Sequence, residues 1–277
     1  MGIEDVKKLR EQTGAPILDC KNALKETNGD FDQATKLLKE KGLADAKKRA
    51  GKATKEGGVY IKIQDNKVAM IELNCETDFV ARNEEFIGLS KTILNSVLET
   101  GDNKVEKYQH FVQELMVKTK ENMALARVYF KKLKSGNAVT DYIHGNNKIG
   151  TLVFFEIDKP ELIDDDEYKE TTLDIAMHTA AMSPMFLNKD SVSQDYIKEN
   201  EEIFYAQVKE SGKPEKIIPN IVKGKINKLC SEICLVEQIF VKDNKLKISN
   251  VLDNLNKKKS ANIKITEFVN FKLGQNE

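Results

Sequence analysis

The chain has 277 residues, enough for two domains or one elaborate domain with a substantial core. Its 44 Lys and Arg side chains equal its 44 Asp and Glu side chains, which argues against a nucleic-acid-binding protein, because phosphate binding requires clustered excess positive charge. We expect a soluble cytoplasmic protein, since the N-terminus has no apolar signal region, no apolar run approaches membrane length, and the four cysteines are too scattered for a disulfide framework.

The first 50 residues predict a small bundle of three helices. Three stretches have the apolar spacing of amphipathic helices: residues 3–9, 17–24 and 31–38. Asp30 can cap the third helix, and Gly42 is in position to end it. Residues 43–56 are rich in Ala and Lys and predict a helical or flexible tether.

Alternating apolar residues predict a strand hairpin over residues 59–73, and Asn83 can cap the helix that follows. Residues 77–80, Thr-Asp-Phe-Val, therefore lie on a strand-to-helix connection, where functional residues concentrate. The aromatic Phe79 in this connection suggests a contact surface. Alternatively, Phe79 and Val80 fold back as a local plug.

The rest of the chain mixes helices and strands, which predicts an α+β fold rather than a doubly wound sheet. Strand-like runs occupy residues 124–133, 139–143 and 149–157, and helical patterns occupy residues 104–120 and 171–182. After Asp190, two helical stretches separated by Ser211–Pro214 predict an antiparallel helical hairpin. Residues 239–273 return to strand-like alternation.

No motif for nucleotide hydrolysis or metal binding is found in the sequence. It has no Gly-rich phosphate loop, and its three histidines are far apart. Cys230 and Cys234 could share a helix face, but two thiols without a nearby histidine rarely bind metal. The acidic run at residues 164–167 lacks the spacing and the glycine of a calcium loop, so we expect a solvated loop there. We therefore predict no cofactor, no metal and no catalytic residue.

Several motifs nevertheless form one recognisable pattern. They are, in chain order, Leu9–Leu24, Glu72–Arg82, Ala176–Ala181 followed by Pro184, Ser211–Pro214 and Val269–Phe271. Together they resemble the elongation factor Ts family and cover nearly the whole chain. The sequence departs from the family pattern at Pro16, at Ile17 and Leu18, and at Thr179.

The resemblance implies a guanine-nucleotide exchange factor, not an enzyme, that binds elongation factor Tu in its GDP form and promotes GDP release and GTP reloading. It implies a ubiquitin-associated-like domain of three helices, then an α+β core of two subdomains from which a helical hairpin protrudes. We accordingly expect a docking domain and tether at 1–55, core subdomains at 56–158 and 159–277, and the hairpin at 190–235. No membrane partner and no direct nucleic-acid partner is expected.

The resemblance also assigns partner contacts residue by residue. It implies dislocation of the magnesium of elongation factor Tu by Thr77, Asp78, Phe79 and Val80, disturbance of its phosphate-binding loop by His178, and N-terminal docking by Arg10, Ile17, Leu18 and Lys21. The role implied for His178 places its ring at the partner surface. By spacing alone, however, His178 shares an apolar helix face with Ile175 and Met182, which is typical of a packed histidine.

Two other functions stay open at this stage. A helical adaptor with an α+β scaffold and no exchange activity would account for the N-terminal bundle but not for the 77–80 connection. An α+β enzyme would need a convergent set of catalytic groups, and His178 is the only candidate. The hairpin at 190–235 could serve dimerisation, partner contact or both, so a homodimer or a two-plus-two complex also stays open.

Overall fold

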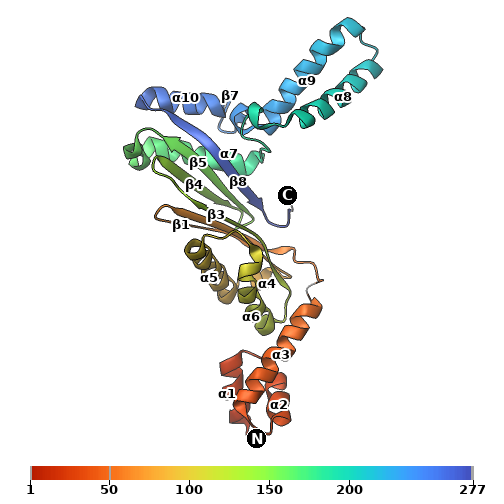
Figure 1. Ribbon diagram of the computed structural model, residues 1–277, viewed down its shortest axis with the longest axis vertical. Coiled ribbons are helices and arrows are strands. Elements are labelled where there is room, and N and C mark those ends of the chain that lie inside the picture. The colour runs from red at the N-terminus through yellow and green to blue at the C-terminus, as the bar shows by residue number, and fades with distance from the viewer. Residues whose placement is uncertain (1, 50, 276–277) are drawn as a thin grey trace. The chain divides into compact units, whose positions relative to one another are not determined.

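The computed structural model describes residues 2–49 and 51–275 and has the α+β composition predicted from the sequence (Figure 1). The chain forms two compact units. The first contains the described residues up to Leu133, the segment Ile143–Gly150 and the described residues from Phe271; the second contains Lys134–Tyr142 and Thr151–Asn270. Within the described ranges, every helix is too short or too polar to cross a lipid bilayer.

The first unit begins with the predicted bundle of three helices: α1 (Ile3–Thr13), α2 (Ile17–Glu26) and α3 (Phe31–Arg49). Its small core is apolar and contains Leu9, Ala15, Cys20, Ala23, Leu24, Ala34 and Leu38. Gly14 ends α1 in the left-handed conformation, at φ 66°, and its N–H donates to the Arg10 carbonyl oxygen at 2.7 Å.

The prediction that Gly42 ends the third helix is wrong, because α3 continues to Arg49. A Cβ atom built on Gly42 would overlap the side chain of Val117 on α6 (Gln109–Thr119). The glycine therefore permits a close helix approach and has no capping role. The Ala and Lys residues that follow favour helix, so the tether is helical over residues 43–49, whereas residues 51–55 form no helix or strand.

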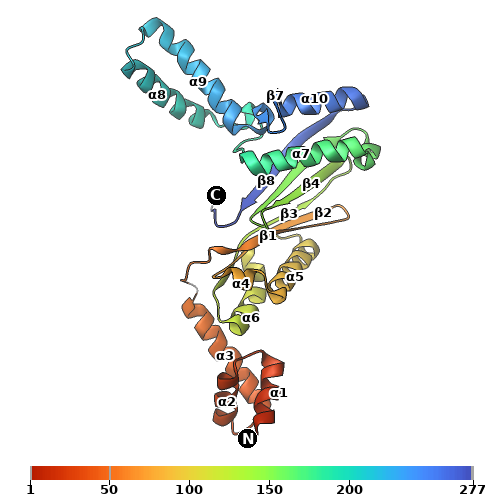
Figure 2. The same ribbon diagram turned by 180° about the vertical axis from the view of Figure 1, so that it is seen from behind.

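The rest of the first unit is built on an antiparallel sheet with the order β1-β2-β3. The strands are β1 (Glu56–Gln64), β2 (Lys67–Cys75) and β3 (Met123–Lys132). The predicted hairpin is thus confirmed. The helices α5 (Glu84–Thr100) and α6 cover one face of this sheet, as Figures 1 and 2 show from opposite sides. Asn83 caps α5 as predicted, since its side-chain oxygen accepts from the Glu85 N–H at 2.8 Å.

The second unit is built around a sheet with the order β4-β5-β8, which lies mostly within it. The strands are β4 (Asn137–His144), β5 (Ile149–Ile157) and β8 (Ile263–Lys272), and a short hairpin is formed by β6 (Ile239–Phe240) and β7 (Asp243–Lys247). The helices α7 (Asp166–Met182) and α10 (Ile248–Lys259) share a core with the sheet. The prediction of strand-like structure over residues 239–273 is therefore wrong for α10, whose buried Ile248, Leu252 and Leu255 have helical spacing.

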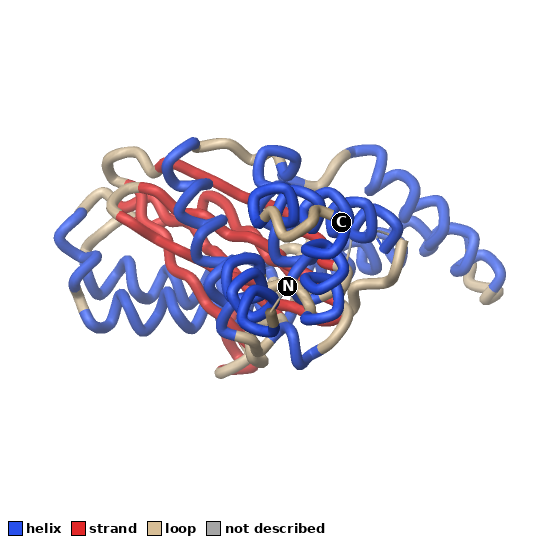
Figure 3. The backbone as a smooth tube through the Cα atoms, turned by 90° about the horizontal axis from the view of Figure 1, so that it is seen from below, coloured by secondary structure: helices blue, strands red, loops and turns tan. Residues whose placement is uncertain are grey.

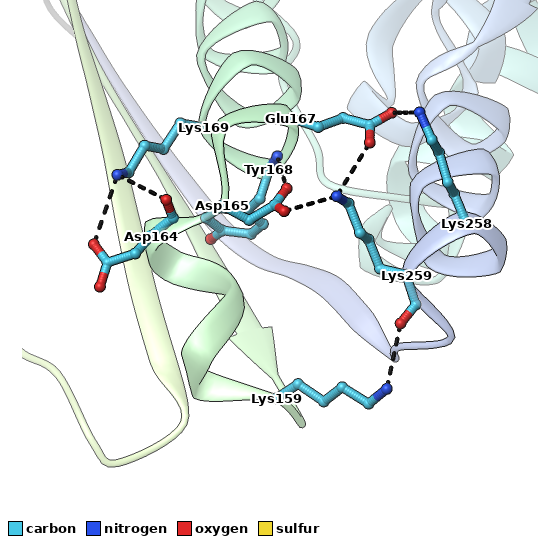
Figure 4. A network of polar contacts seen from close by, with 8 residues as sticks. All are labelled: Lys159, Asp164, Asp165, Glu167, Tyr168, Lys169, Lys258 and Lys259. Carbon is cyan, nitrogen blue, oxygen red and sulfur yellow. Dashed lines mark hydrogen bonds and ion pairs between the residues drawn. The ribbon is translucent and has the colours of Figure 1, made fainter.

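The acidic run at 164–167 faces solvent at Asp164 and Asp166 as expected, but it lies across the end of a short helix, η2 (Pro160–Asp164), and the start of α7 rather than in a loop. Asp165 caps the helix by accepting from the Tyr168 N–H at 3.0 Å, and it pairs with Lys259 at 2.7 Å (Figure 4). Glu167 pairs with Lys258 at 2.6 Å. The hydrogen bond from Lys259 lowers the pKa of Asp165, as suits a carboxylate at the positive end of a helix dipole.

The helices α8 (Gln194–Glu210) and α9 (Ile218–Ile233) pack along each other (Figures 1 and 2) and are joined by a short loop, drawn in tan in Figure 3. Val208, Ile218 and Val222 are buried between them. The remaining short helices are α4 (Asp78–Ala81), η1 (Val105–Tyr108), η2 (Pro160–Asp164), η3 (Lys189–Ser191), η4 (Glu215–Ile217) and η5 (Leu235–Glu237).

Candidate functional site

The connection between β2 and α5 contains the short helix α4 and places its two apolar side chains differently. Phe79 is 83% exposed, whereas Val80 is half-buried and packs against the core of the first unit. The plug predicted as an alternative thus describes Val80 but not Phe79. We call residues 77–80 the TDFV loop.

The exposure of Phe79 follows from the size of α4, which has only four residues. Val80 and Ala81 pack against the core, while Asp78 and Arg82 form an ion pair at 3.0 Å on the exposed side. A surface pair of this kind contributes little to stability. Because the Phe79 ring itself is mostly exposed, it contributes little to the stability of the fold, and its apolar area is available to a partner.

The base of the TDFV loop is fixed by buried and half-buried polar groups. The Cys75 thiol donates to the Thr77 carbonyl oxygen at 3.2 Å. Burial, with a smaller effect of the Glu121 and Glu56 carboxylates, raises the pKa of Cys75 to about 12, so this side chain stays a neutral thiol. Thr77 caps α4 by accepting from the Val80 N–H at 3.4 Å, and it donates its own hydroxyl to Glu121 at 2.8 Å.

Glu121 was missed by the sequence analysis. It lies 44 residues from Thr77 in sequence, in the connection between α6 and β3. In the sequence, Glu121 shows only as an acidic residue followed by Asn122 just before a strand, and this pattern does not indicate any particular role.

The expectation that the His178 ring lies at a partner surface is wrong, because this side chain on α7 is fully buried. Its Nδ1 accepts from the Val241 N–H at 3.3 Å, so the proton belongs on Nε2, which donates to Gln238 Oε1 at 3.0 Å. Desolvation lowers the pKa of His178, with a smaller opposing effect from the Gln238 hydrogen bond, and the ring is held neutral. The alternative of a packed histidine is confirmed.

The hairpin of β6 and β7 lies against His178 and covers its side chain. The hydrogen bond to Val241 brings the end of this hairpin onto the face of α7 that holds His178, and no local pattern in the sequence indicates this placement. Three apolar side chains close in sequence to the His178 network are nevertheless exposed: Met182, Met185 and Val241.

The four expected N-terminal contact residues are all exposed. Ile17, Leu18 and Lys21 belong to the first turns of α2, and Arg10 belongs to the last turn of α1. The opposite face of α2 buries Cys20, Ala23 and Leu24 in the bundle core. Ile17 and Leu18 are therefore large apolar side chains that the bundle does not use for its own packing.

The expected contacts thus belong to α1, α2, the TDFV loop and α7. The TDFV loop and the N-terminal set belong to the first unit, and His178 belongs to the second. In the described ranges, no group of three or more His, Cys, Asp or Glu side chains could hold a metal ion. Cys230 and Cys234 are both buried beside Val192.

Comparison with known proteins places the chain among related sequences. The family model described as elongation factor TS matches residues 76–275. A protein named elongation factor Ts from Treponema denticola is 41% identical over 271 residues, which are 98% of this chain and 97% of the relative. Relatives of the same name from Borrelia recurrentis and Clostridium perfringens are 38% and 40% identical over 98% of this chain, and cover 98% and 92% of their own lengths.

Proposed function

We propose that this chain, which belongs to the elongation factor Ts family, binds elongation factor Tu in its GDP form and promotes GDP release and GTP reloading. Membership of the family implies a nucleotide exchange factor of translation elongation. One observation carries this proposal: Phe79 is exposed on a loop whose base is fixed.

Exchange of this kind makes and breaks no covalent bond. It requires contacts that favour the nucleotide-free state of the partner, and by linkage bound nucleotide must weaken those contacts equally. An exposed aromatic ring suits this purpose, because the area it buries in the complex is not already buried in the free protein.

In this proposal the TDFV loop enters elongation factor Tu near its magnesium site, with Phe79 as an apolar wedge. Burial of a Phe side chain contributes about 1.5 to 3 kcal/mol, and about 1.4 kcal/mol corresponds to a factor of ten in rate. The wedge then accounts for about one to two powers of ten in GDP release. Asp78 acts on the cation region by charge or hydrogen bonding, and Thr77 and Val80 hold the loop. Loss of the magnesium and phosphate contacts of the nucleotide supplies the rest of the acceleration of GDP release.

The second unit would act on the phosphate-binding loop of the partner. Since His178 is buried, we assign the contact to the exposed side chains close to its network, Met182 and Val241, and assign to His178 the support of that surface through its hydrogen bond to the Val241 amide. Docking would use Arg10, Ile17, Leu18 and Lys21 on a module comprising residues 1–55, ahead of core subdomains at 56–158 and 159–277.

The test is to mix the full chain with elongation factor Tu loaded with a fluorescent GDP and to follow the release rate by stopped flow. We expect release to accelerate with the concentration of the chain and to saturate. Ile163→Ala, which truncates an exposed apolar side chain on η2, serves as a control and should behave as the unmodified chain.

A binding module without exchange activity is the second candidate, and the exposed Ile17 and Leu18 on a small helical bundle are what favour it. The same experiment separates the two functions. A chain that binds elongation factor Tu in a pull-down but leaves the GDP release rate unchanged would be such a module.

A further inference from the structure

Two short segments leave the sheet of the first unit side by side. Cys75 of β2 pairs with Met123 of β3 in the antiparallel register. Glu76 and Thr77, which follow β2, therefore lie beside Glu121 and Asn122, which precede β3. The sheet thus brings the start of the TDFV loop against a segment that is more than 40 residues away in sequence.

Every polar group of Thr77 is bound within this arrangement. Its N–H and its hydroxyl donate to the two carboxylate oxygens of Glu121, at 3.2 and 2.8 Å. Its carbonyl oxygen accepts from the Cys75 thiol at 3.2 Å, and its hydroxyl oxygen accepts from the Val80 N–H at 3.4 Å. Glu121 thereby fixes the residue that caps α4 and so the direction in which α4 leaves the sheet.

The next hydrogen bond runs in the other direction, from the segment before β3 to the segment after β2. Glu76 accepts from the Asn122 N–H at 2.6 Å and pairs with the Lys52 ammonium at 3.1 Å. The buried Asn122 donates its side-chain amide to the Lys52 carbonyl oxygen at 2.6 Å. The connection from α3 to β1, which contains Lys52, is thus joined to the same group of residues.

We propose that Glu121 is a positioning residue for nucleotide exchange, which holds Thr77 and thereby keeps the Phe79 wedge aimed outward before the partner arrives. This inference rests on the proposed function of the TDFV loop. A four-residue helix gains little stability from its own hydrogen bonds, so its direction depends on the packing of Val80 and Ala81 and on how its first residue is held. A wedge that is already ordered loses less conformational entropy on binding than a mobile one.

The test uses the full chain with Glu121→Gln and Glu121→Ala, and Asp102→Asn as a matched control. Asp102, like Glu121, accepts from a main-chain N–H, that of Lys104 at 2.8 Å, and it also pairs with Lys107. It lies beyond the C-terminal end of the 17-residue helix α5, about 25 Å along that helix from the TDFV loop. Three measurements are made on each variant: the GDP release rate against chain concentration, hydrogen exchange of the amides of residues 77–82, and the melting temperature.

For Glu121→Ala we expect the maximal release rate to fall about tenfold, because two hydrogen bonds to a charged group are lost. The concentration giving half of the maximal rate should change less than about twofold, since the docking surfaces are intact. Glu121→Gln retains one oxygen acceptor and should lose about threefold. Amide exchange at 77–82 should rise in both variants, and Asp102→Asn should match the unmodified chain in release and loop exchange.

A double variant tests whether Glu121 acts through the wedge. Phe79→Ala should slow release about tenfold or more alone but less than about twofold further in the Glu121→Ala chain, because the wedge is already misplaced there. Equal losses for Glu121→Gln and Glu121→Ala would indicate a direct effect of the charge on the partner and would overturn the proposal. Two other results would also overturn it. One is full additivity of the effects of Glu121→Ala and Phe79→Ala on the release rate. The other is an increase in the chain concentration that gives half of the maximal rate, with the maximal rate itself unchanged.

The outcome is distinguishable from failure of the proposed function. If the unmodified chain does not accelerate GDP release, the exchange function is wrong, and loop exchange alone then decides whether Glu121 positions the loop. Unchanged amide exchange at 77–82 in Glu121→Gln would reject the positioning role whatever the activity. If Glu121→Ala does not fold, Glu121→Gln is judged against Asp102→Asn by the same three measurements.

Discussion

Truncation of Phe79 to Ala separates contact energy from folding energy most sharply. The ring is 83% exposed in the free chain, so its removal should change the free energy of unfolding by less than about 1 kcal/mol. If the ring becomes buried in the complex, the variant loses about 1.5 to 3 kcal/mol of contact energy. GDP release from elongation factor Tu should then slow by about one to two powers of ten.

Phe86 provides the matched contrast, because it lies seven residues later and is fully buried in the core of the same unit. Phe86→Ala should cost about 3 to 5 kcal/mol of stability. Stopped-flow release of fluorescent GDP, measured together with thermal unfolding of both variants, tests the distinction. The reasoning fails if Phe79→Ala melts as early as Phe86→Ala, or if it releases GDP at the unmodified rate.

Four further predictions concern the other contacts and the stability of the chain. Asp78→Ala should slow release less when magnesium is chelated before mixing, whereas the Phe79 effect should persist; equal behaviour of the two variants with and without chelator would contradict separate roles. Deleting residues 1–50 should leave the core folded and raise the concentration needed for half-maximal release; full efficiency at low concentration would reject a docking role. His178→Ala should lower the melting temperature and the rate of nucleotide exchange together. It leaves a cavity, and it removes the hydrogen-bond partner of Gln238 Oε1 and that of the Val241 amide. Burial lowers the pKa of His178 below 6.5, so as the pH falls the unfolded chain binds a proton before the folded chain does. The free energy of unfolding should therefore decrease as the pH falls below about 6.5, and it should decrease less steeply in His178→Ala. Parallel curves of stability against pH for the two chains would contradict this.

The elements that sequence reasoning predicted correctly have local causes. The strand hairpin shows in the period-two alternation, and the start of α5 shows in Asn83 followed by acidic residues. Each signal lies within one short stretch of the chain, and no distant contact is needed to interpret it. The position of the TDFV loop between these two elements was predictable for the same reason.

Three other features were missed because they depend on a distant segment, whereas the start of α7 and the helix α10 have local signals, the Asp165 cap and the spacing of Ile248, Leu252 and Leu255. Gly42 would be a good helix end by itself, but the space it leaves is occupied by Val117 of α6. The burial of His178 depends on Val241 and Gln238, about 60 residues further along the chain. Glu121 acquires its significance only because the register of β2 and β3 brings it to Thr77.

The contrast between Phe79 and His178 limits what a motif can transfer. Both residues belong to stretches that match the family, yet one is exposed and the other is fully buried. A motif specifies which side chain stands at a position, but accessibility depends on the elements packed around it. A buried ring can affect a partner only through what it supports, and for His178 the supported group is the amide of Val241, whose own side chain is exposed. The consequence is that substitutions at His178 should change exchange and stability together, whereas substitutions at Phe79 should change exchange alone.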